Sequence, residues 1–442
     1  MPAVKHESQK LDQDNTICQA CTPTKRILFQ NVNIFDGTSD VLLEGMSLLV
    51  EGNLIAKIAP TISTADDDTV TVIDGGGRTL MPGLIAMHEH IMMQMTVGEI
   101  LTSDSRFFAY VATVTAKVYL QNGFTSIRDA AGNTFALKAA IERGYIEGPR
   151  IFPSGPMISQ SGGHADHRMP AHPSCFCDFT GSKDILQKYG DMCVVDGVPE
   201  MLKAAREALR LGATQIKIAV GGGTGSYSDP LEVVEFTNEE IQAAVKAAED
   251  YQTYVMAHVY NTKGIRRAID NGVKCIEHAN LIDEPTLQLM KDKKVWLSPQ
   301  VSVYTFIPHG YTEDQSNKHR QAFAGIDNMF EIAKKIGYDQ IVFGSDVITD
   351  MEMVKRFPEE FVHRSKWFTP VQILQQATSH GGQLLQLSQR FNPGQLGVLQ
   401  EGALADMLLV EGNPLDDISI MAKPHENFKI IMRDGQIYKN EL

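Results

Sequence analysis

Two histidines stand two positions apart inside an apolar run, MPGLIAMHEHIMM, at residues 81–93. Alternate side chains of a β-strand point to the same face, so we expect His88 and His90 to project together from the end of one strand. Two imidazoles that point in one direction can bind a metal ion. An isolated pair of this kind is also compatible with one core and one surface histidine, so the interpretation depends on whether further ligands follow downstream.

Further polar residues follow where apolar strands are predicted to end. Lys217 lies in QIKIAV, His258 ends YVMAH, His278 ends CIEH and Asp346 ends IVFGSD. Histidine and aspartate are common ligands of divalent metals, whereas an ammonium group is not a ligand and is costly to bury beside cations. Lys217 therefore needs chemical conversion: a neutral, desolvated amine can react with CO₂ to give a carbamate, an anion able to bridge two metal ions.

The segments that carry these residues alternate between helix and short apolar strand. VPEMLKAAREALRLG is predicted as a helix, with Pro199 in its first turn and Gly212 at its end. TNEEIQAAVKAAED opens with a capping box formed by Thr237 and Glu240. The strands TQIKIAV and YVMAH follow these helices, and three more helix and strand pairs lead to QIVFGSD. Such repeated units predict an α/β fold over residues 81–392, a (β/α)₈ TIM barrel with its chemistry at the strand C-termini.

Both ends of the chain have a different pattern. The runs RILFQNVNIF, MSLLVEGNLIAKIA and TVTVID are short, β-rich and broken by glycine turns, and GVLQEGALADMLLVEG and IIMRDGQIYKN repeat this texture after Pro393. We expect residues 25–80 and 393–442 to form one small discontinuous β-sandwich domain. Residues 1–24 are expected to be a poorly ordered N-terminal extension.

The composition favours small-molecule chemistry. The net charge of −14 argues against nucleic acid or an anionic membrane as a partner. No apolar run approaches the roughly 20 residues of a membrane span, and no hydrophobic leader is visible at the N-terminus. The six cysteines, which include the close pairs Cys18/Cys21 and Cys175/Cys177, are too sparse for a disulfide framework and lack a complete zinc spacing. We expect thiols in a cytoplasmic protein.

The order of these motifs resembles the binuclear amidohydrolase superfamily. The shared features are HxH after Pro-Gly-Leu, a lysine in the fourth strand, single histidines ending the fifth and sixth, and Gly-Ser-Asp in the eighth. Within the superfamily, SQSGGHADHR, VVDGVPEMLKAAREALRLGATQIKIAVGGG and IEHANLIDE are similar to the imidazolonepropionase-like branch, which includes ochratoxinase and the Xaa-Pro or Xaa-Arg dipeptidases. The resemblance covers nearly the whole chain after about Lys25, and the bridging lysine is typical of the two-metal hydrolases.

The resemblance implies two divalent metal ions and a CO₂-derived carbamate on Lys217. Zinc is the default ion for a histidine-rich site, with Co²⁺ or Mn²⁺ able to replace it. One ion would be bound by His88, His90, the carbamate and Asp346, and the other by the carbamate, His258 and His278. Asp346 would also act as the catalytic proton acceptor.

Two loops supply candidate substrate contacts. Tyr227, in GGGTGSYSDP, is a candidate donor to the developing oxyanion, although packing on the barrel rim explains it equally well. His164 and Arg168, in SGGHADHR, are candidates for substrate orientation or for binding a substrate carboxylate, with Arg128 as an alternative for the second role. Asp129 is expected to be a structural carboxylate or one that supports a ligand.

The predicted function is hydrolysis of the amide bond of a dipeptide or N-acyl amino acid, with ochratoxin-type amides among the candidate substrates. We also expect a homo-oligomer. Two alternatives stay open at this stage: a cyclic amidine deaminase or imidazolonepropionase-type hydrolase, and a non-enzymatic scaffold. A scaffold would be expected to lose metal ligands, whereas this chain has a residue that matches the family's ligand at all six positions.

Overall fold

The computed structural model describes residues 25–63, 69–169, 172 and 183–442. The N-terminal extension and the pairs Cys18/Cys21 and Cys175/Cys177 lie outside the described residues. The two described cysteines, Cys193 and Cys275, are free thiols. In the part of the chain described, no helix is both long enough and apolar enough to cross a membrane.

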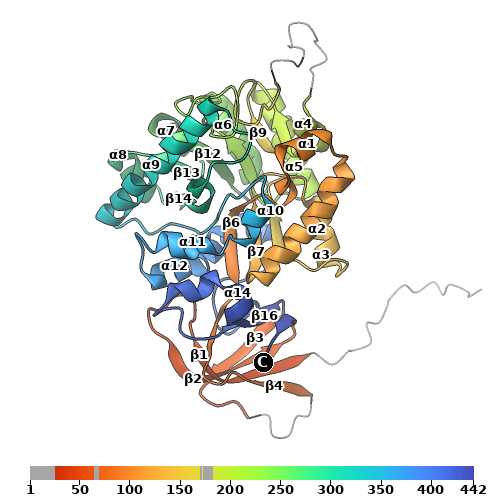
Figure 1. The fold of residues 1–442 in the computed structure, drawn as a ribbon, viewed down its shortest axis with the longest axis vertical. Coiled ribbons are helices and arrows are strands. Elements are labelled where there is room, and N and C mark those ends of the chain that lie inside the picture. Colours follow the sequence, from red (N-terminus) through yellow and green to blue (C-terminus); the bar gives the residue numbers. More distant parts are fainter. Residues whose placement is uncertain (1–24, 64–68, 170–171, 173–182) are drawn as a thin grey trace, which may run out of the picture.

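Parallel strands form the wall of the predicted barrel, which lies above the β-rich part of the molecule (Figure 1). One sheet contains β6 (Leu84–Glu89), β7 (Phe124–Asp129) and β8 (Arg150–Pro153). The other contains, in spatial order, β10 (Met192–Val194), β9 (Met157–Ser159), β11 (Ile216–Ala219), β12 (Val255–Asn261), β13 (Cys275–Leu281) and β14 (Trp296–Ser298).

Single backbone hydrogen bonds join the two sheets into a ring. Val342 N donates to Leu297 O at 3.0 Å, and Met87 N donates to Phe343 O at 2.7 Å, so residues 341–346 fill the eighth position. On the other side, Thr214 N donates to the carbonyl of Pro153 at 2.8 Å. The (β/α)₈ architecture predicted from the sequence is confirmed.

The eighth position differs from the regular strand that was predicted, because only Ile341 forms a bridge there, with Leu297. The backbone then passes very close to β6: a Cβ atom at Gly344 would lie 2.8 Å from His88 N. Asp346 follows with φ of +55°, a conformation that non-glycine residues rarely adopt. This irregular path carries the Asp346 side chain into the barrel mouth.

Helices cover the outside of the barrel, and their ends follow local sequence signals. The predicted helix with Pro199 is α5, which ends before Gly212 at φ of +109°, and Thr237 and Glu240 form the predicted capping box of α6. The helix predicted to contain FEIAKKIG is longer than expected, because a second capping box at Thr312 starts it much earlier. The α-helices are α1 (Val97–Thr102), α2 (Ser105–Gln121), α3 (Phe135–Glu142), α4 (Ile185–Tyr189), α5 (Val198–Leu211), α6 (Asn238–Asp250), α7 (Thr262–Asp270), α8 (Glu284–Asp292), α9 (Glu313–Ile336), α10 (Met351–Lys355), α11 (Glu359–Arg364), α12 (Pro370–Gln376), α13 (Ser379–Leu385) and α14 (Pro424–Asn427). Short 3₁₀ turns are η1 (Ile91–Met93), η2 (Ser302–Thr305), η3 (Gln386–Phe391) and η4 (Ile418–Ala422).

Strands from both ends of the sequence form the β-rich domain, coloured red to orange and blue in Figure 1. Their order is β17 (Gln436–Asn440), β16 (Phe428–Arg433), β15 (Met407–Val410), β5 (Thr79–Pro82), β1 (Arg26–Ile34), β2 (Leu43–Glu51) and β3 (Leu54–Ala59), and β4 (Val70–Asp74) also pairs with β1. The two chain ends meet directly, because β5 and β15 pair antiparallel with Met81 opposite Leu408. Only Gly83 separates β5 from β6, so this domain is connected to the histidine-bearing strand without a linker.

Candidate metal centre and active site

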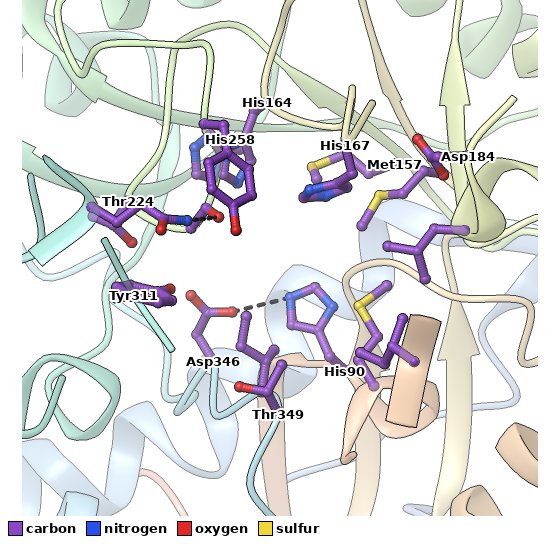
Figure 2. A pocket seen from close by; sticks show the side chains of 18 of the residues that line it. His90, Met157, His164, His167, Asp184, Thr224, His258, Tyr311, Asp346 and Thr349 are labelled. Carbon is purple, nitrogen blue, oxygen red and sulfur yellow. Dashed lines mark hydrogen bonds and ion pairs between the residues drawn. The ribbon is translucent and has the colours of Figure 1, made fainter. Parts of the chain in front are cut away.

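Two histidines and one aspartate converge at the mouth of the barrel. His88 and His90 come from the end of β6, and Asp346 from the eighth segment. Asp346 Oδ1 lies 3.0 Å from His90 Nε2 (Figure 2). The same oxygen lies 3.4 Å from His88 Nε2. One donor atom from each residue falls within 4.8 Å of the others, a spacing that suits a single divalent ion.

The other candidate ligands border the same cavity of about 400 Å³. The ring centroid of His278 lies 4.9 Å from that of His88 and 4.5 Å from that of His258. Lys217 lies on β11, beside the strand that carries His258, and is 1% exposed. The structure therefore brings all six sequence-predicted ligands to one site.

Each of the four imidazoles has one ring nitrogen occupied by an acceptor from the protein. The pairs are His88 Nδ1 with Glu277 Oε2 at 2.7 Å, His90 Nδ1 with Ala131 O at 3.3 Å, His258 Nε2 with Gly222 O at 3.2 Å, and His278 Nδ1 with Gln300 Oε1 at 2.7 Å. Histidines that bind metals commonly donate their other N–H in this way, which fixes the tautomer and the orientation of the ring. The donor set and its supporting contacts fit a metal centre.

Lys217 is buried beside these imidazoles. Burial is the main cause that lowers its pKa to about 8, and Glu277 and Asp346 partly oppose this effect. No hydrogen bond joins its ammonium group to another residue in the described part of the chain. A lowered pKa leaves a larger neutral fraction of this amine than of an exposed lysine, and the neutral amine is the form that reacts with CO₂.

A buried ion pair that the sequence analysis missed supports His88. Glu277 accepts from Arg128 Nη2 at 2.7 Å and contacts His88 Nδ1 at the same distance. Burial is the largest single effect on Glu277 and would raise its pKa, but Arg128, His88 and Lys217 together outweigh burial and hold that pKa below its usual range. Arg128 also donates to the Met87 carbonyl and is completely buried, so its suggested contact with a substrate carboxylate is wrong.

Glu277 and His278 are adjacent on β13, so strict strand alternation would place them on opposite faces. Both nevertheless reach His88, because His278 and Ala279 have φ of +72° and +56°. Backbone strain of this kind persists where the surrounding structure enforces it, and it is typical of functional sites.

Removing the cation of the buried pair is expected to destabilise the protein strongly. Arg128→Met leaves the Glu277 carboxylate buried without its partner, and we expect the free energy of unfolding to fall by about 3 to 5 kcal/mol. Arg210→Met is the matched control, because Arg210 pairs with Glu207 on the surface, where such pairs contribute only about 0 to 1 kcal/mol. Chemical denaturation of both variants measures the difference, and equal stability of the two would contradict the assigned role of Arg128.

His164 stands directly behind one of the candidate ligands. Its ring stacks on that of His258 with centroids 4.0 Å apart, and its Nδ1 lies 3.1 Å from both Asp229 Oδ2 and Ser226 Oγ. The loop after β11 needs glycine here, since a Cβ atom at Gly223 would lie 2.0 Å from the His164 ring. His164 borders the cavity, as the sequence analysis expected of a substrate contact.

Arg168 has a different environment. Its Nε and Nη2 donate to both carboxylate oxygens of Asp166 at 2.7 and 2.5 Å. It is not among the residues that line the cavity, in contrast to His164 and His167 from the same loop. The structure therefore does not bring Arg168 to the site.

Several tyrosines lie closer to the candidate ligands than the sequence analysis expected. Tyr227 lines the cavity but is 46% exposed, as a rim residue would be. Tyr260 is buried, its ring stacks on His278 with centroids 5.0 Å apart, and its hydroxyl lies 2.6 Å from that of Tyr304. Tyr311 lies beside Asp346 (Figure 2). Tyr260 could have been found from the sequence, because it follows His258 at strand spacing.

Two further carboxylates, at the ends of β6 and β7, accept hydrogen bonds from neighbouring segments. Asp129 accepts from Ile91 N at 3.0 Å, which makes it a structural residue, one of the two roles expected for it. Glu89, between the two histidines of HEH, accepts from Tyr119 and from the backbone and side chain of Ser345. Burial raises the pKa of Glu89 to about 8. These contacts connect the end of β6 to the segment that carries Asp346.

Comparison with known proteins identifies the family of this chain. Residues 79–439 match the amidohydrolase family. The chain is 30% identical over 342 residues to ochratoxinase from Aspergillus niger, a match that covers 72% of this chain and 66% of that protein, slightly less than two thirds of its length. A crystal structure of a prolidase complexed with N-methylphosphonate-L-proline superimposes with a TM-score of 0.85 at 32% identity and covers 94% of this chain and 100% of the other.

A crystal structure of a Xaa-Pro dipeptidase with methionine bound in its active site also has the same fold. It superimposes with a TM-score of 0.80 at 29% identity, covering 94% of this chain and 100% of the other. The family match spans most of the sequence, including every strand that carries a candidate ligand. The chain belongs to the amidohydrolase family.

Proposed function

We propose that the protein is a metal-dependent hydrolase that cleaves the amide bond of a dipeptide or an N-acyl amino acid. The observation that carries this proposal is the convergence of four oriented imidazoles, Asp346 and Lys217 on one cavity. Relatives named ochratoxinase, prolidase and Xaa-Pro dipeptidase support an amide as the substrate. Lys217 favours a two-metal hydrolase over a cyclic amidine deaminase.

The proposed centre would hold two divalent ions, most simply zinc, with a carbamylated Lys217 among their ligands. The first would be held by His88, His90, Asp346 and the carbamate. The second would be held by the carbamate, His258 through Nδ1 and His278 through Nε2, since the other nitrogen of each ring is already occupied. When bound, the ions supply a water of lowered pKa as nucleophile and polarise the scissile carbonyl.

Asp346 is suited to move the proton in this reaction. Burial would raise its pKa, but the surrounding imidazoles, with His88 foremost, outweigh burial and keep that pKa below its usual value. The carboxylate is therefore ionised at neutral pH and can accept the proton of the attacking water, then pass it to the leaving nitrogen. We assign the hydrogen bond to the developing oxyanion to Tyr260 in preference to Tyr227, because a donor in a dry site stabilises charge more strongly than one at an exposed rim.

The proposal is tested with metal-loaded protein and a panel of N-acyl amino acids and dipeptides. We expect release of the free amino acid, loss of this activity after chelation, and recovery when Zn²⁺ is returned. Cyclic amidines are included in the panel, and release of ammonia from them without cleavage of any acyl amino acid would support the deaminase instead.

The same panel tests whether a free carboxylate is recognised beyond the scissile amide. Capping a good substrate as its C-terminal amide is expected to reduce kcat/KM by about 30-fold to 1,000-fold, because the donors that bind the carboxylate lose their charged partner. His164→Ala should remove this discrimination, whereas Arg168→Ala should preserve it, since Arg168 is bound to Asp166 away from the cavity. Equal rates for acid and amide on the wild type would show that no carboxylate is recognised.

A further inference from the structure

The cavity has two chemically different sides. His164, His258 and Tyr311 lie on one side, and Met157 lies across the cavity from His258 (Figure 2). Met157 and four other apolar residues that line the cavity belong to one buried hydrophobic cluster, and we call this set the methionine wall: Met93, Ile100, Met157, Leu186 and Met192. All five residues are buried and come from different elements of the fold, so the wall belongs to the interior and is not an incidental surface patch.

The three methionines of the wall lie in elements that themselves carry no candidate ligand. Met93 lies in η1, Met157 in β9 and Met192 in the neighbouring β10. β9 and β10 pair parallel with Met157 opposite Met192. The two residues are therefore fixed side by side at the backbone, while their flexible side chains can adapt to different shapes.

The polar groups on this side offer little to a charged substituent. Asp184 accepts hydrogen bonds from Gln187 N and Nε2, both at 2.9 Å, and thereby caps α4. His167 is mainly neutral near pH 7, because burial lowers its pKa. Lys183 and Lys188 also line the cavity but are exposed to solvent. A charged group placed against the wall would lose water without gaining a buried counterion, which is costly.

We propose that the substrate carries a large apolar substituent, aromatic or branched aliphatic, on one side of its scissile amide, and that this group packs on the methionine wall. This inference rests on the proposed amide hydrolysis and specifies its substrate class. Because methionines adapt to shape, the site should select for apolar bulk and against charge, and should discriminate poorly among apolar groups of similar size.

Two matched series of N-acyl amino acids test the proposal with the metal-loaded full chain. One series varies the acyl group from acetyl through hexanoyl to naphthoyl, and the other varies the amino acid among Ala, Leu, Phe, Glu and Lys. In at least one series we expect kcat/KM to rise by about 30-fold or more from the smallest to the largest apolar group, the gain from burying a large side chain. If the substrates are hydrolysed but kcat/KM does not change with the size of the apolar group in either series, the inference is overturned and the proposed function is not affected.

Substitutions in the methionine wall test whether its residues cause the preference for large apolar substituents. Met157→Gln replaces the thioether by an amide of similar size, and Met192→Phe fills space on the wall. Each variant should lower the ratio of kcat/KM for the naphthoyl substrate to kcat/KM for the acetyl substrate by about 10-fold. In Met157→Gln the cause is an amide without a hydrogen-bond partner, and in Met192→Phe it is the contact area that the substituent loses. Met290→Gln, in a buried position on α8 away from the cavity, should leave that ratio unchanged. A ratio that is unchanged in both wall variants contradicts the proposal.

A binding measurement keeps the inference testable if no substrate is turned over. Dansyl amino acids contain a sulfonamide in place of the carboxamide, and their fluorescence reports an apolar environment. Saturable binding of dansyl-phenylalanine that weakens about 10-fold in Met157→Gln, but not in Met290→Gln, supports the wall as the apolar site. Absence of saturable binding to the wild type overturns it, whereas absence of amide hydrolysis alone overturns only the proposed function.

Discussion

Replacement of Lys217 by alanine is expected to abolish turnover and to remove metal from the bridged site. Lys217 is 1% exposed among the imidazoles, and the proposal uses it as an anion formed from CO₂, not as a cation. Its loss should reduce kcat by on the order of 10³-fold or more, the scale for removal of a principal electrostatic group. Elemental analysis and steady-state kinetics on the same preparation measure both effects.

Chemical rescue of Lys217→Ala distinguishes a carbamate on Lys217 from a purely structural role of this lysine. Short-chain carboxylates such as formate or acetate should restore part of the metal content and activity of Lys217→Ala, because they can occupy the place of the missing anion. Lys217→Arg is the control, since it keeps a cation, cannot form the carbamate and leaves no space for the added acid. Two bound metals with normal activity in Lys217→Ala would rule out the bridging role.

Asp346→Asn is expected to reduce turnover by about 10² or more, the usual scale for losing a general base, while at least one metal ion stays bound. The substitution keeps the size of the side chain and one oxygen ligand but removes the proton acceptor. Asp346 Oδ1 is 3.0 Å from His90 Nε2, so an amide oxygen in that position can still contribute to metal binding. Metal analysis together with kcat distinguishes the two functions of the residue.

A second buried aspartate provides the comparison. Asp406 is 3% exposed and pairs with Arg150 outside the cavity. Asp406→Asn is expected to lower stability and to leave kcat of the folded protein unchanged. If Asp346→Asn retains metal and has the wild-type rate, Asp346 is a ligand only.

Much of the fold and the identities of the candidate ligands could be predicted from the sequence alone. Helix caps such as Thr237 with Glu240 are local signals, and the structure contains that capping box as predicted. His258 and His278 were predicted at equivalent positions near the C-terminal ends of successive parallel strands, so they could be placed together without coordinates. In the structure both strands continue beyond the histidines, to Asn261 and Leu281. The ligand types then followed from chemistry, because histidine and aspartate are the side chains that bind such ions.

Only the tertiary structure decided which of the remaining polar residues belong to the site. Glu277 supports His88 across 189 positions of sequence, and no local pattern reports a contact of that kind. The same holds for Arg128, which the sequence left as a candidate substrate contact and the structure buries against Glu277. Arg168 shows the opposite case, since it binds a carboxylate only two positions away, Asp166, and is not among the residues that line the cavity.

The apolar lining of the cavity could also not be predicted from the sequence. Met157 and Met192 look like ordinary core residues in the chain, because an apolar side chain gives the same pattern whether it packs against protein or lines a cavity. Pairing of β9 with β10 sets them side by side, and both residues line the cavity. The sequence determined which residues can bind metal, because ligand chemistry is a property of single residues. The tertiary structure decided which other residues line the substrate cavity, because a cavity forms only between segments that are distant in the chain.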